Sequence, residues 1–125
     1  MKADSVTAPR ILVLASGSGT NLQALINASR ERDFPGQIVA VGCNRPGAFA
    51  LERAAQANFD AFTVDHTHYG SREEFDGALM AEIRRHNPDL IVLAGFMRIL
   101  TTDFVRALRG TMLNVHPSLL PKYIR

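Results

Sequence analysis

The feature that most constrains this chain is a series of short apolar runs separated by amphipathic stretches. The first run, RILVLAS over residues 10–16, has no polar residue between Ile11 and Ala15. Such a run is typical of a strand that is covered on both faces. Strands that alternate with helices form βαβ units on a parallel sheet. We therefore predict an α/β fold, a Rossmann-like three-layer sandwich with a mostly parallel sheet, with strands over residues 10–16, 37–43, 61–64, 90–94 and 112–116.

Capping signals place helices between these strands. Thr20 and Gln23 have the spacing of a capping box, which predicts a helix that runs to about residue 32. Ser71 and Glu74 repeat that spacing and predict the start of another helix. Further helices are predicted over residues 48–57 and from a cap at Thr102 to Gly110.

The composition favours one globular domain. The 125 residues are 46% hydrophobic and 21% charged, and we assign the domain to residues 10–125 behind a flexible tail over residues 1–9. The net charge is +2 and the basic residues are scattered, so we expect no nucleic-acid partner. The apolar runs are too short to cross a bilayer, which predicts a cytoplasmic protein with small-molecule partners and no membrane contact. The single Cys43 excludes an internal disulfide and predicts a buried thiol.

Three segments of unusual composition follow predicted strands, namely residues 16–21, 95–100 and 114–118. Ligands of open parallel sheets bind at the carboxyl ends of the strands, near the point where the strand order reverses. Right-handed crossovers would make the strands before these segments neighbours. We therefore expect the three segments to line one crevice.

The first of these segments, Ser-Gly-Ser-Gly-Thr-Asn, leads into a predicted helix N-terminus. Glycines let the backbone approach an anion, and the free N–H groups and the dipole of the helix favour phosphate. The segment is no dinucleotide fingerprint, because Leu22 occupies the position of the third glycine, and it lacks the Gly-Lys pair of a P-loop. Phosphate binding is the hypothesis that we prefer, and a plain strand-to-helix turn is the alternative.

Asn114 and His116 are two residues apart in a predicted strand, so their side chains leave the same face. An amide donor beside an imidazole can stabilise an oxyanion, and histidine can transfer protons near neutral pH. The alternative is a hydrogen-bonded polar pair at the end of a strand. The position of the pair in the predicted crevice favours the catalytic interpretation.

Other polar residues carry weaker signals. His66 and His68 lie near Asp65 in a predicted loop, an arrangement that suits either a metal ion or, more simply, solvated histidines. We predict no metal site. Met80, Met97 and Met112 are most simply part of the core.

Three segments together carry a family resemblance: Ser-Gly-Ser-Gly-Thr-Asn-Leu over residues 16–22, Ala-Gly-Phe-Met-Arg-Ile-Leu over 94–100, and Asn-Val-His-Pro-Ser-Leu-Leu-Pro-Lys-Tyr over 114–123. In order and spacing the chain resembles the N-terminal portion of the phosphoribosylglycinamide formyltransferases (GAR transformylases) of purine biosynthesis. The Asn-x-His element is shared by folate-dependent formyltransferases in general and so indicates the class of reaction. The glycine loop indicates which formyltransferase the chain resembles, and hence the substrate.

The resemblance implies a transfer of the formyl group of 10-formyltetrahydrofolate, a co-substrate, to the amine of phosphoribosylglycinamide. Gly19, Thr20 and Asn21 would hold the ribose 5-phosphate, and Arg72 would meet the distal acidic part of the folate. The residues that would contact the rest of the folate are Met97, Arg98, Ile99, Leu100 and Asn114.

The family also implies the catalytic pair. His116, as imidazolium, and Asn114 would stabilise the oxyanion of the tetrahedral intermediate, and His116 would protonate the leaving folate nitrogen. Members of the family continue beyond the end of this sequence and carry an aspartate that orients the histidine. We therefore expect a domain truncated at its C-terminal side, with impaired turnover and with an exposed sheet edge that favours a homo-oligomer.

Two alternative functions stay open at this point. Formyltetrahydrofolate hydrolase shares the Asn and His but passes the formyl group to water, and it has no need of a phosphate loop. A non-catalytic phosphosugar-binding module would bind through the loop and have no activity for His116 to support.

Overall fold

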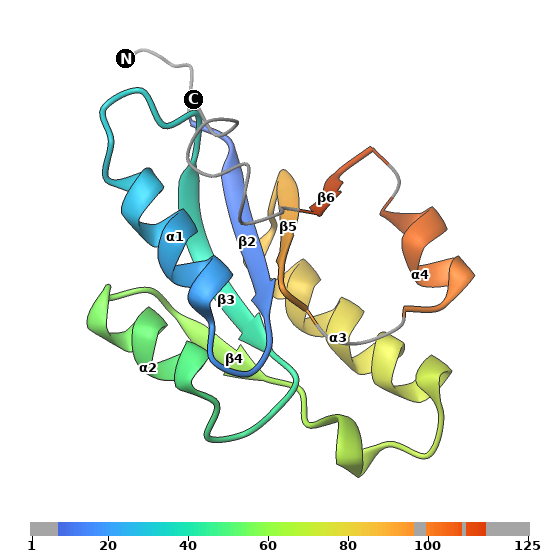
Figure 1. The fold of residues 1–125 in the computed structure, drawn as a ribbon. Helices are drawn as coiled ribbons and strands as arrows, with labels where there is room; N and C mark the ends of the chain where they lie inside the picture. The colour runs from blue at the N-terminus through green and yellow to red at the C-terminus, as the bar shows by residue number, and fades with distance from the viewer. Residues whose placement is uncertain (1–7, 97–99, 109, 115–125) are drawn as a thin grey trace.

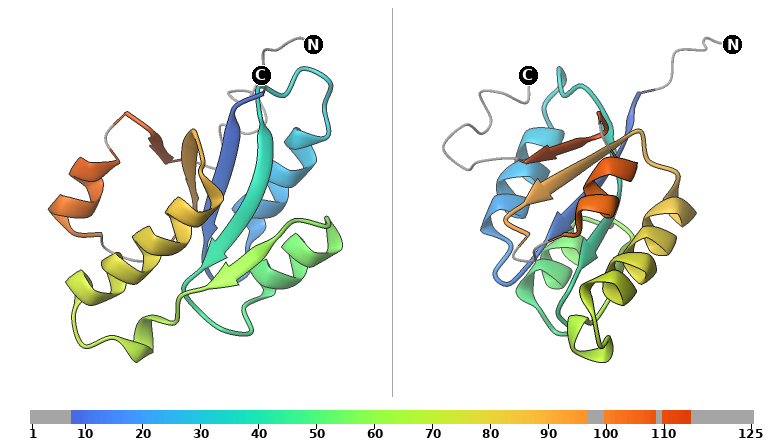
Figure 2. Two further views of the ribbon diagram at one scale, coloured as in Figure 1. Left: turned by 180° about the vertical axis from the view of Figure 1, so that it is seen from behind. Right: turned by 90° about the vertical axis from the view of Figure 1, so that its right-hand side faces the viewer.

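The computed structural model describes residues 8–96, 100–108 and 110–114, which form a sheet with helices on both faces (Figures 1 and 2). The five strands of this part of the chain lie in the order β4-β3-β2-β5-β6, and all neighbouring pairs are parallel. The predicted α/β class is confirmed. The strands are β2 (Arg10–Ala15), β3 (Gln37–Cys43), β4 (Ala61–Thr63), β5 (Leu90–Ala94) and β6 (Met112–Asn114). Most of the predicted tail over residues 1–9 lies outside the described residues.

The strand order reverses next to β2. The chain adds β3 and β4 on one side of β2 and then crosses to the other side, where it adds β5 and β6. Residues 11–15 of β2 pair in register with residues 90–94 of β5. The strands predicted at 10–16, 90–94 and 112–116 are therefore neighbours, as expected. This reversal marks the crevice where ligands of such sheets bind.

Two helices cover each face of the sheet, as the opposed views of Figures 1 and 2 show. Side chains of α1 and α2 pack in one core cluster, and side chains of α3 and α4 pack in the other. The helices are α1 (Thr20–Ser29), α2 (Phe49–Gln56), α3 (Arg72–His86) and α4 (Thr102–Ala107), with a short 3-10 helix η1 (His66–His68).

The apolar run of β2 serves both cores. Ile11 and Val13 pack with α1 and α2, whereas Leu12 and Leu14 pack with α3. Successive side chains of a strand point to opposite faces, so a strand between two helical layers needs apolar residues at every position. Strand β2 is therefore held by packing on both of its faces.

The capping residues predicted for α1 and α4 are wrong by one position. Gly19, in a left-handed conformation and without a side-chain cap, is the N-cap of α1, so Thr20 is its first helical residue. At α4 the cap is Thr101 and not Thr102, because the hydroxyl of Thr101 accepts from the N–H of Phe104 at 3.1 Å. A tertiary contact selects Thr101, since its own N–H donates to the buried carboxylate of Asp76 at 2.7 Å.

Of the other predicted helix ends, the cap of α3 is confirmed and the end of α1 is wrong. The hydroxyl of Ser71 caps α3 by accepting from the N–H of Glu74 at 3.1 Å, as predicted. The carboxylate of Glu74, however, accepts from the N–H of Gly70 at 2.9 Å. Helix α1 ends at Ser29, before the predicted residue 32. Residues 30–33 are exposed, so a longer helix would bury no further apolar surface.

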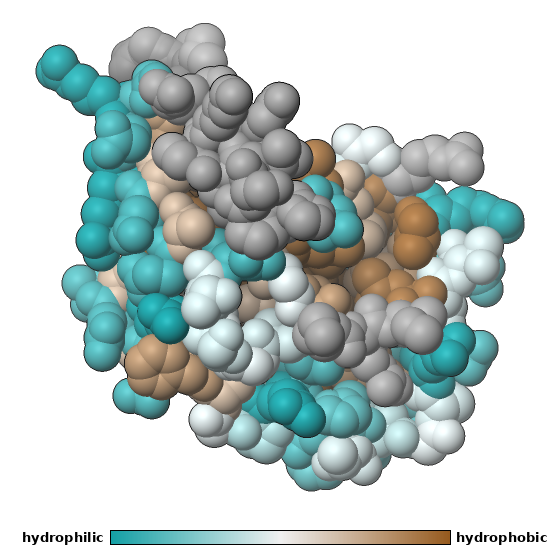
Figure 3. Space-filling view, viewed as in Figure 1, coloured by the Kyte–Doolittle hydropathy of each residue, from teal (hydrophilic) through white to brown (hydrophobic). Residues whose placement is uncertain are grey.

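One edge of the described sheet carries exposed apolar side chains, as expected for a surface through which copies of the chain could associate. Strand β6 lies at one edge, and Figure 3 shows apolar side chains gathered near β6 and α4. Leu113 is 48% exposed and Val105 is 47% exposed. Homo-oligomer formation through this edge stays a prediction.

Cys43 is buried at the end of β3, as expected. No helix in the described part of the chain has the length and apolarity that a membrane span requires.

Substitution by alanine should change the free energy of unfolding in opposite directions at Gly42 and at Gly77. A Cβ at Gly42 would lie 2.5 Å from Cζ of Phe62 and 2.8 Å from Cδ2 of Leu14, whereas a Cβ at Gly77 would meet no atom within 4 Å. Gly42→Ala should lower the free energy of unfolding by about 1–3 kcal/mol through overpacking. Gly77→Ala, in the exposed interior of α3, should raise it by about 0.5–1 kcal/mol. Urea denaturation measures both, and equal effects of the same sign would contradict this packing.

Candidate functional site

The loop between β2 and α1 is fixed at its first residue. Ser16, 8% exposed, donates its hydroxyl hydrogen to Oδ1 of Asn44 at 2.7 Å, and Asn44 is itself buried at the carboxyl end of β3. The loop then turns through Gly17 and Gly19, with φ of 60° and 72°. Glycine adopts this left-handed region without the steric cost that other residues incur. The two loops that follow β2 and β3 are thereby joined by a buried hydrogen bond.

Gly19 brings the loop into contact with α2. A Cβ at this position would lie 2.8 Å from Cα of Ala50 and 2.9 Å from its Cβ, a distance that only a shift of backbone could relieve. The N–H of Ala50 also donates to the carbonyl of Gly17 at 3.2 Å. Glycine at residue 19 is therefore required both for its conformation and for its lack of a side chain.

The first turn of α1 is open to a ligand. The N-cap Gly19 offers no side chain, and no side-chain hydrogen bond caps the helix. The first N–H groups of a helix have no partner within it, and together with the helix dipole they favour an anion. The first turn also holds no acidic residue that would repel one.

The open turn lines a cavity of about 250 Å³ at the carboxyl ends of β2 and β5. Asn21 reaches across this cavity: a Cβ at Gly95 would lie 3.1 Å from Nδ2 of Asn21. The crevice predicted from the strand order is therefore present where the first two of its segments meet. Its lining residues are Ser16, Gly17, Ser18, Gly19, Thr20, Asn21, Ala94 and Gly95.

The other predicted site residues are placed as follows. Asn114 is exposed at the end of β6 and pairs in register with Leu93 of β5. Leu100 packs against the core cluster of α3 and α4. Arg72 is exposed as the first residue of α3 and does not line the 250 Å³ cavity. Met97, Arg98, Ile99 and His116 lie outside the described residues.

A second, larger cavity of about 530 Å³ lies on the other side of the glycine loop. It is lined by Gly17 and Ser18, by residues 45–49 after β3, and by residues 65–67 after β4. No function was predicted from the sequence for Asn44 and the residues after it. The rule on carboxyl strand ends applied to residues 37–43 would have found them.

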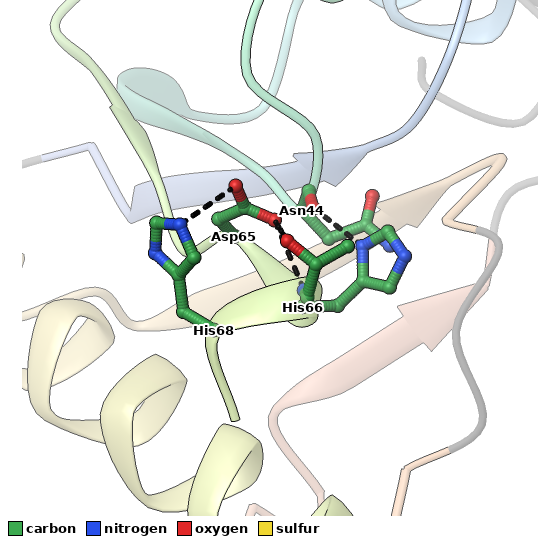
Figure 4. Close-up of polar contacts among 5 residues, drawn as sticks. Asn44, Asp65, His66 and His68 are labelled. Atoms are coloured by element: carbon green, nitrogen blue, oxygen red, sulfur yellow. Dashed lines mark hydrogen bonds and ion pairs between the residues drawn. The ribbon is translucent and has the colours of Figure 1, made fainter. Parts of the chain in front are cut away.

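The histidines of η1 make local polar contacts (Figure 4), and His66 also lines this cavity. His66 donates from Nδ1 to the carbonyl of Asn44 at 2.9 Å, and Nε2 of His68 lies 3.3 Å from Oδ2 of Asp65. The hydroxyl and the N–H of Thr67 donate to the carboxylate of Asp65 and hold its pKa below the usual value, with a further contribution from the two histidines. Within the described ranges no group of three or more such side chains is arranged to hold a metal ion.

Comparison with known proteins gives the family. A family model described as formyl transferase matches residues 9–124. The chain is 50% identical over 113 residues to the phosphoribosylglycinamide formyltransferase of Escherichia coli, which covers 90% of this chain and 53% of that protein. It is also 50% identical over 121 residues to the trifunctional purine biosynthetic protein adenosine-3 of Chironomus tentans, covering 95% of this chain and 9% of the relative.

A solved structure agrees with these matches. The crystal structure of phosphoribosylglycinamide formyltransferase from Brucella melitensis superposes with a TM-score of 0.83 and 36% identity, over 94% of this chain and 61% of that one. This chain thus spans about half the length of its bacterial curated relative. The resemblance predicted from the sequence is confirmed, and the chain belongs to the formyl transferase family.

Proposed function

We propose that this chain carries part of the active site of a phosphoribosylglycinamide formyltransferase, which transfers the formyl group of 10-formyltetrahydrofolate to the amine of phosphoribosylglycinamide. The observation that carries the proposal is the cavity where the uncapped first turn of α1 meets Gly95 at the end of β5. The names of the relatives support the same activity.

The phosphate of phosphoribosylglycinamide binds at the start of α1. The N–H groups of Gly19, Thr20 and Asn21 supply the hydrogen bonds, and the dipole of the ten-residue helix adds a favourable field. The amine end of the substrate extends along the carboxyl ends of β5 and β6, toward Asn114. This order places the phosphate and the reacting group at opposite ends of the crevice.

The folate is a co-substrate, and the proposal includes no metal ion. Leu100 and Asn114 contact it from the ends of β5 and β6, and Arg72 meets its distal carboxylates. Met97, Arg98 and Ile99 complete the proposed contact set from outside the described residues. A guanidinium at residue 72 suits this role because it binds carboxylates through paired hydrogen bonds.

The proposed reaction is a direct acyl transfer. The amine nitrogen attacks the formyl carbon, a new C–N bond forms, and the bond from that carbon to the folate N10 breaks. Asn114 and His116 donate hydrogen bonds to the oxyanion of the intermediate. His116, as imidazolium, donates a proton to N10, and the proton released by the attacking amine restores it.

Gly19→Ala tests the phosphate loop against a matched glycine. Gly19 and Gly47 both have a φ of 72°, but a Cβ at Gly47 meets no atom within 4 Å. Gly19→Ala should displace the loop and raise the Kd of phosphoribosylglycinamide at least tenfold, about the effect of one lost hydrogen bond to a charged group. Gly47→Ala carries the same backbone strain and should leave the Kd within about twofold. Calorimetric titration measures both, and an equal loss in the two variants would argue against phosphate binding at α1.

Asn114→Ala tests the proposed chemistry. Loss of an oxyanion donor should lower the single-turnover rate of formyl transfer by about 10²–10³ and leave the Kd of phosphoribosylglycinamide unchanged. Leu113→Ala alters the exposed neighbour in β6 and serves as the control, with an unchanged rate. An unchanged rate in Asn114→Ala would contradict the role of the amide. Release of free formate without formylated amine would support the hydrolase alternative instead.

A further inference from the structure

Arg53 reaches from α2 to the loop between β2 and α1. Its Nε–H donates to the carbonyl of Ser18 at 2.7 Å, and Nη1 donates to Oε1 of Gln23 at 3.2 Å. The guanidinium carbon lies 4.6 Å from the ring centroid of Phe49, so a cation–π contact supports the group from a third direction. These contacts fix a half-buried arginine in one conformation.

Gln23 in α1 extends this set of contacts. Its Nε2 donates to Oδ1 of Asn27 at 3.0 Å, an interaction one turn apart on the helix surface. That contact orients the amide so that Oε1 faces Arg53. The spacing from Thr20 predicts that Gln23 belongs to a capping box, whereas in the structure Gln23 accepts a hydrogen bond from Arg53.

The contact with Ser18 has a directional consequence for the loop. A trans peptide unit points its C=O and its N–H to opposite sides. The carbonyl of Ser18 shares its peptide unit with the N–H of Gly19, and the carbonyl of Gly17, which accepts from Ala50, shares its unit with the N–H of Ser18. Both carbonyls are bound to α2, so the N–H groups of Ser18 and Gly19 point away from α2.

A charged donor also strengthens the group at the other end of the peptide unit. Hydrogen bonds to guanidinium are stronger than neutral ones, and hydrogen bonds in a chain polarise one another. The bond from Arg53 to the carbonyl of Ser18 therefore makes the N–H of Gly19 a better donor to an anion.

We propose that Arg53 is a positioning residue for phosphate recognition: it holds the carbonyl side of the loop on α2 and thereby presents the N–H of Gly19 to the substrate phosphate. This inference rests on the proposed function. Helix α2 supplies no residue to the 250 Å³ cavity. Through Arg53, however, it controls the affinity of that cavity for phosphate esters.

Arg45 provides a matched control for charge. It is exposed, lies beside the same loop in the lining of the 530 Å³ cavity, and its guanidinium forms no hydrogen bond or ion pair with the residues that the structure describes. Arg53→Met and Arg45→Met each remove one positive charge near Ser18. Only Arg53→Met removes donors from the loop, and Arg53→Lys retains the charge without the paired donors.

The experiment measures two quantities on the purified chain and its variants. Calorimetry gives the Kd of phosphoribosylglycinamide, and NMR relaxation without ligand gives the backbone order parameters of Ser18 and Gly19. Arg53→Met should raise the Kd about tenfold and lower both order parameters, with a smaller change in Arg53→Lys. Arg45→Met should leave the order parameters unchanged and alter the Kd by no more than about twofold.

Equal losses of affinity in Arg53→Met and Arg45→Met, with unchanged order parameters, would overturn the inference because charge alone would account for them. A wild-type chain that binds no phosphoribosylglycinamide would count against the proposed function. In that case lower order parameters in Arg53→Met still support the positioning role, and unchanged ones overturn it. Thermal unfolding of each variant verifies that the fold is intact.

Discussion

The site depends on one close approach, that of the glycine loop to helix α2. A side chain at Gly19 would bring a Cβ within 2.8 Å of the backbone of Ala50, so the loop reaches this position only because no side chain is there. The approach lets Ala50 and Arg53 bind the carbonyls of the loop. The N–H groups at the start of α1 are left for a ligand, as an anion site on a helix requires.

The sheet determines where this loop lies. Strand β2 has neighbours on both sides and apolar contacts on both faces, so its carboxyl end is held rigidly at the reversal of strand order. The end of β5 lies beside it and contributes Gly95 to the same cavity. A sheet edge of this kind positions backbone donors before the ligand arrives, which reduces the loss of conformational entropy on binding and favours affinity for small ligands.

Elements that depend on a local sequence pattern could be predicted from the sequence. Features that depend on tertiary contacts could not. The apolar runs predicted β3 and β5 with their observed bounds, because buried strands need such runs whatever surrounds them. The cap of α4 was placed at Thr102 because two adjacent threonines are locally equivalent, and the distant Asp76 selects Thr101. The role of Arg53 has no signal in the sequence, since it depends on how α2 packs beside the loop. The part of the crevice between the ends of β2 and β5 was predicted because strand order follows from general rules of connection.

The central claim is that phosphate binds at the start of α1, and mapping of backbone amide chemical shifts tests it most directly. The uniformly ¹⁵N-labelled chain is titrated with phosphoribosylglycinamide while the amide signals are followed by NMR. The account predicts that the largest changes occur at Gly19, Thr20 and Asn21, with smaller changes at Gly95. Changes centred instead on residues 45–49 and 65–67, which line the larger cavity on the other side of the loop, would contradict it.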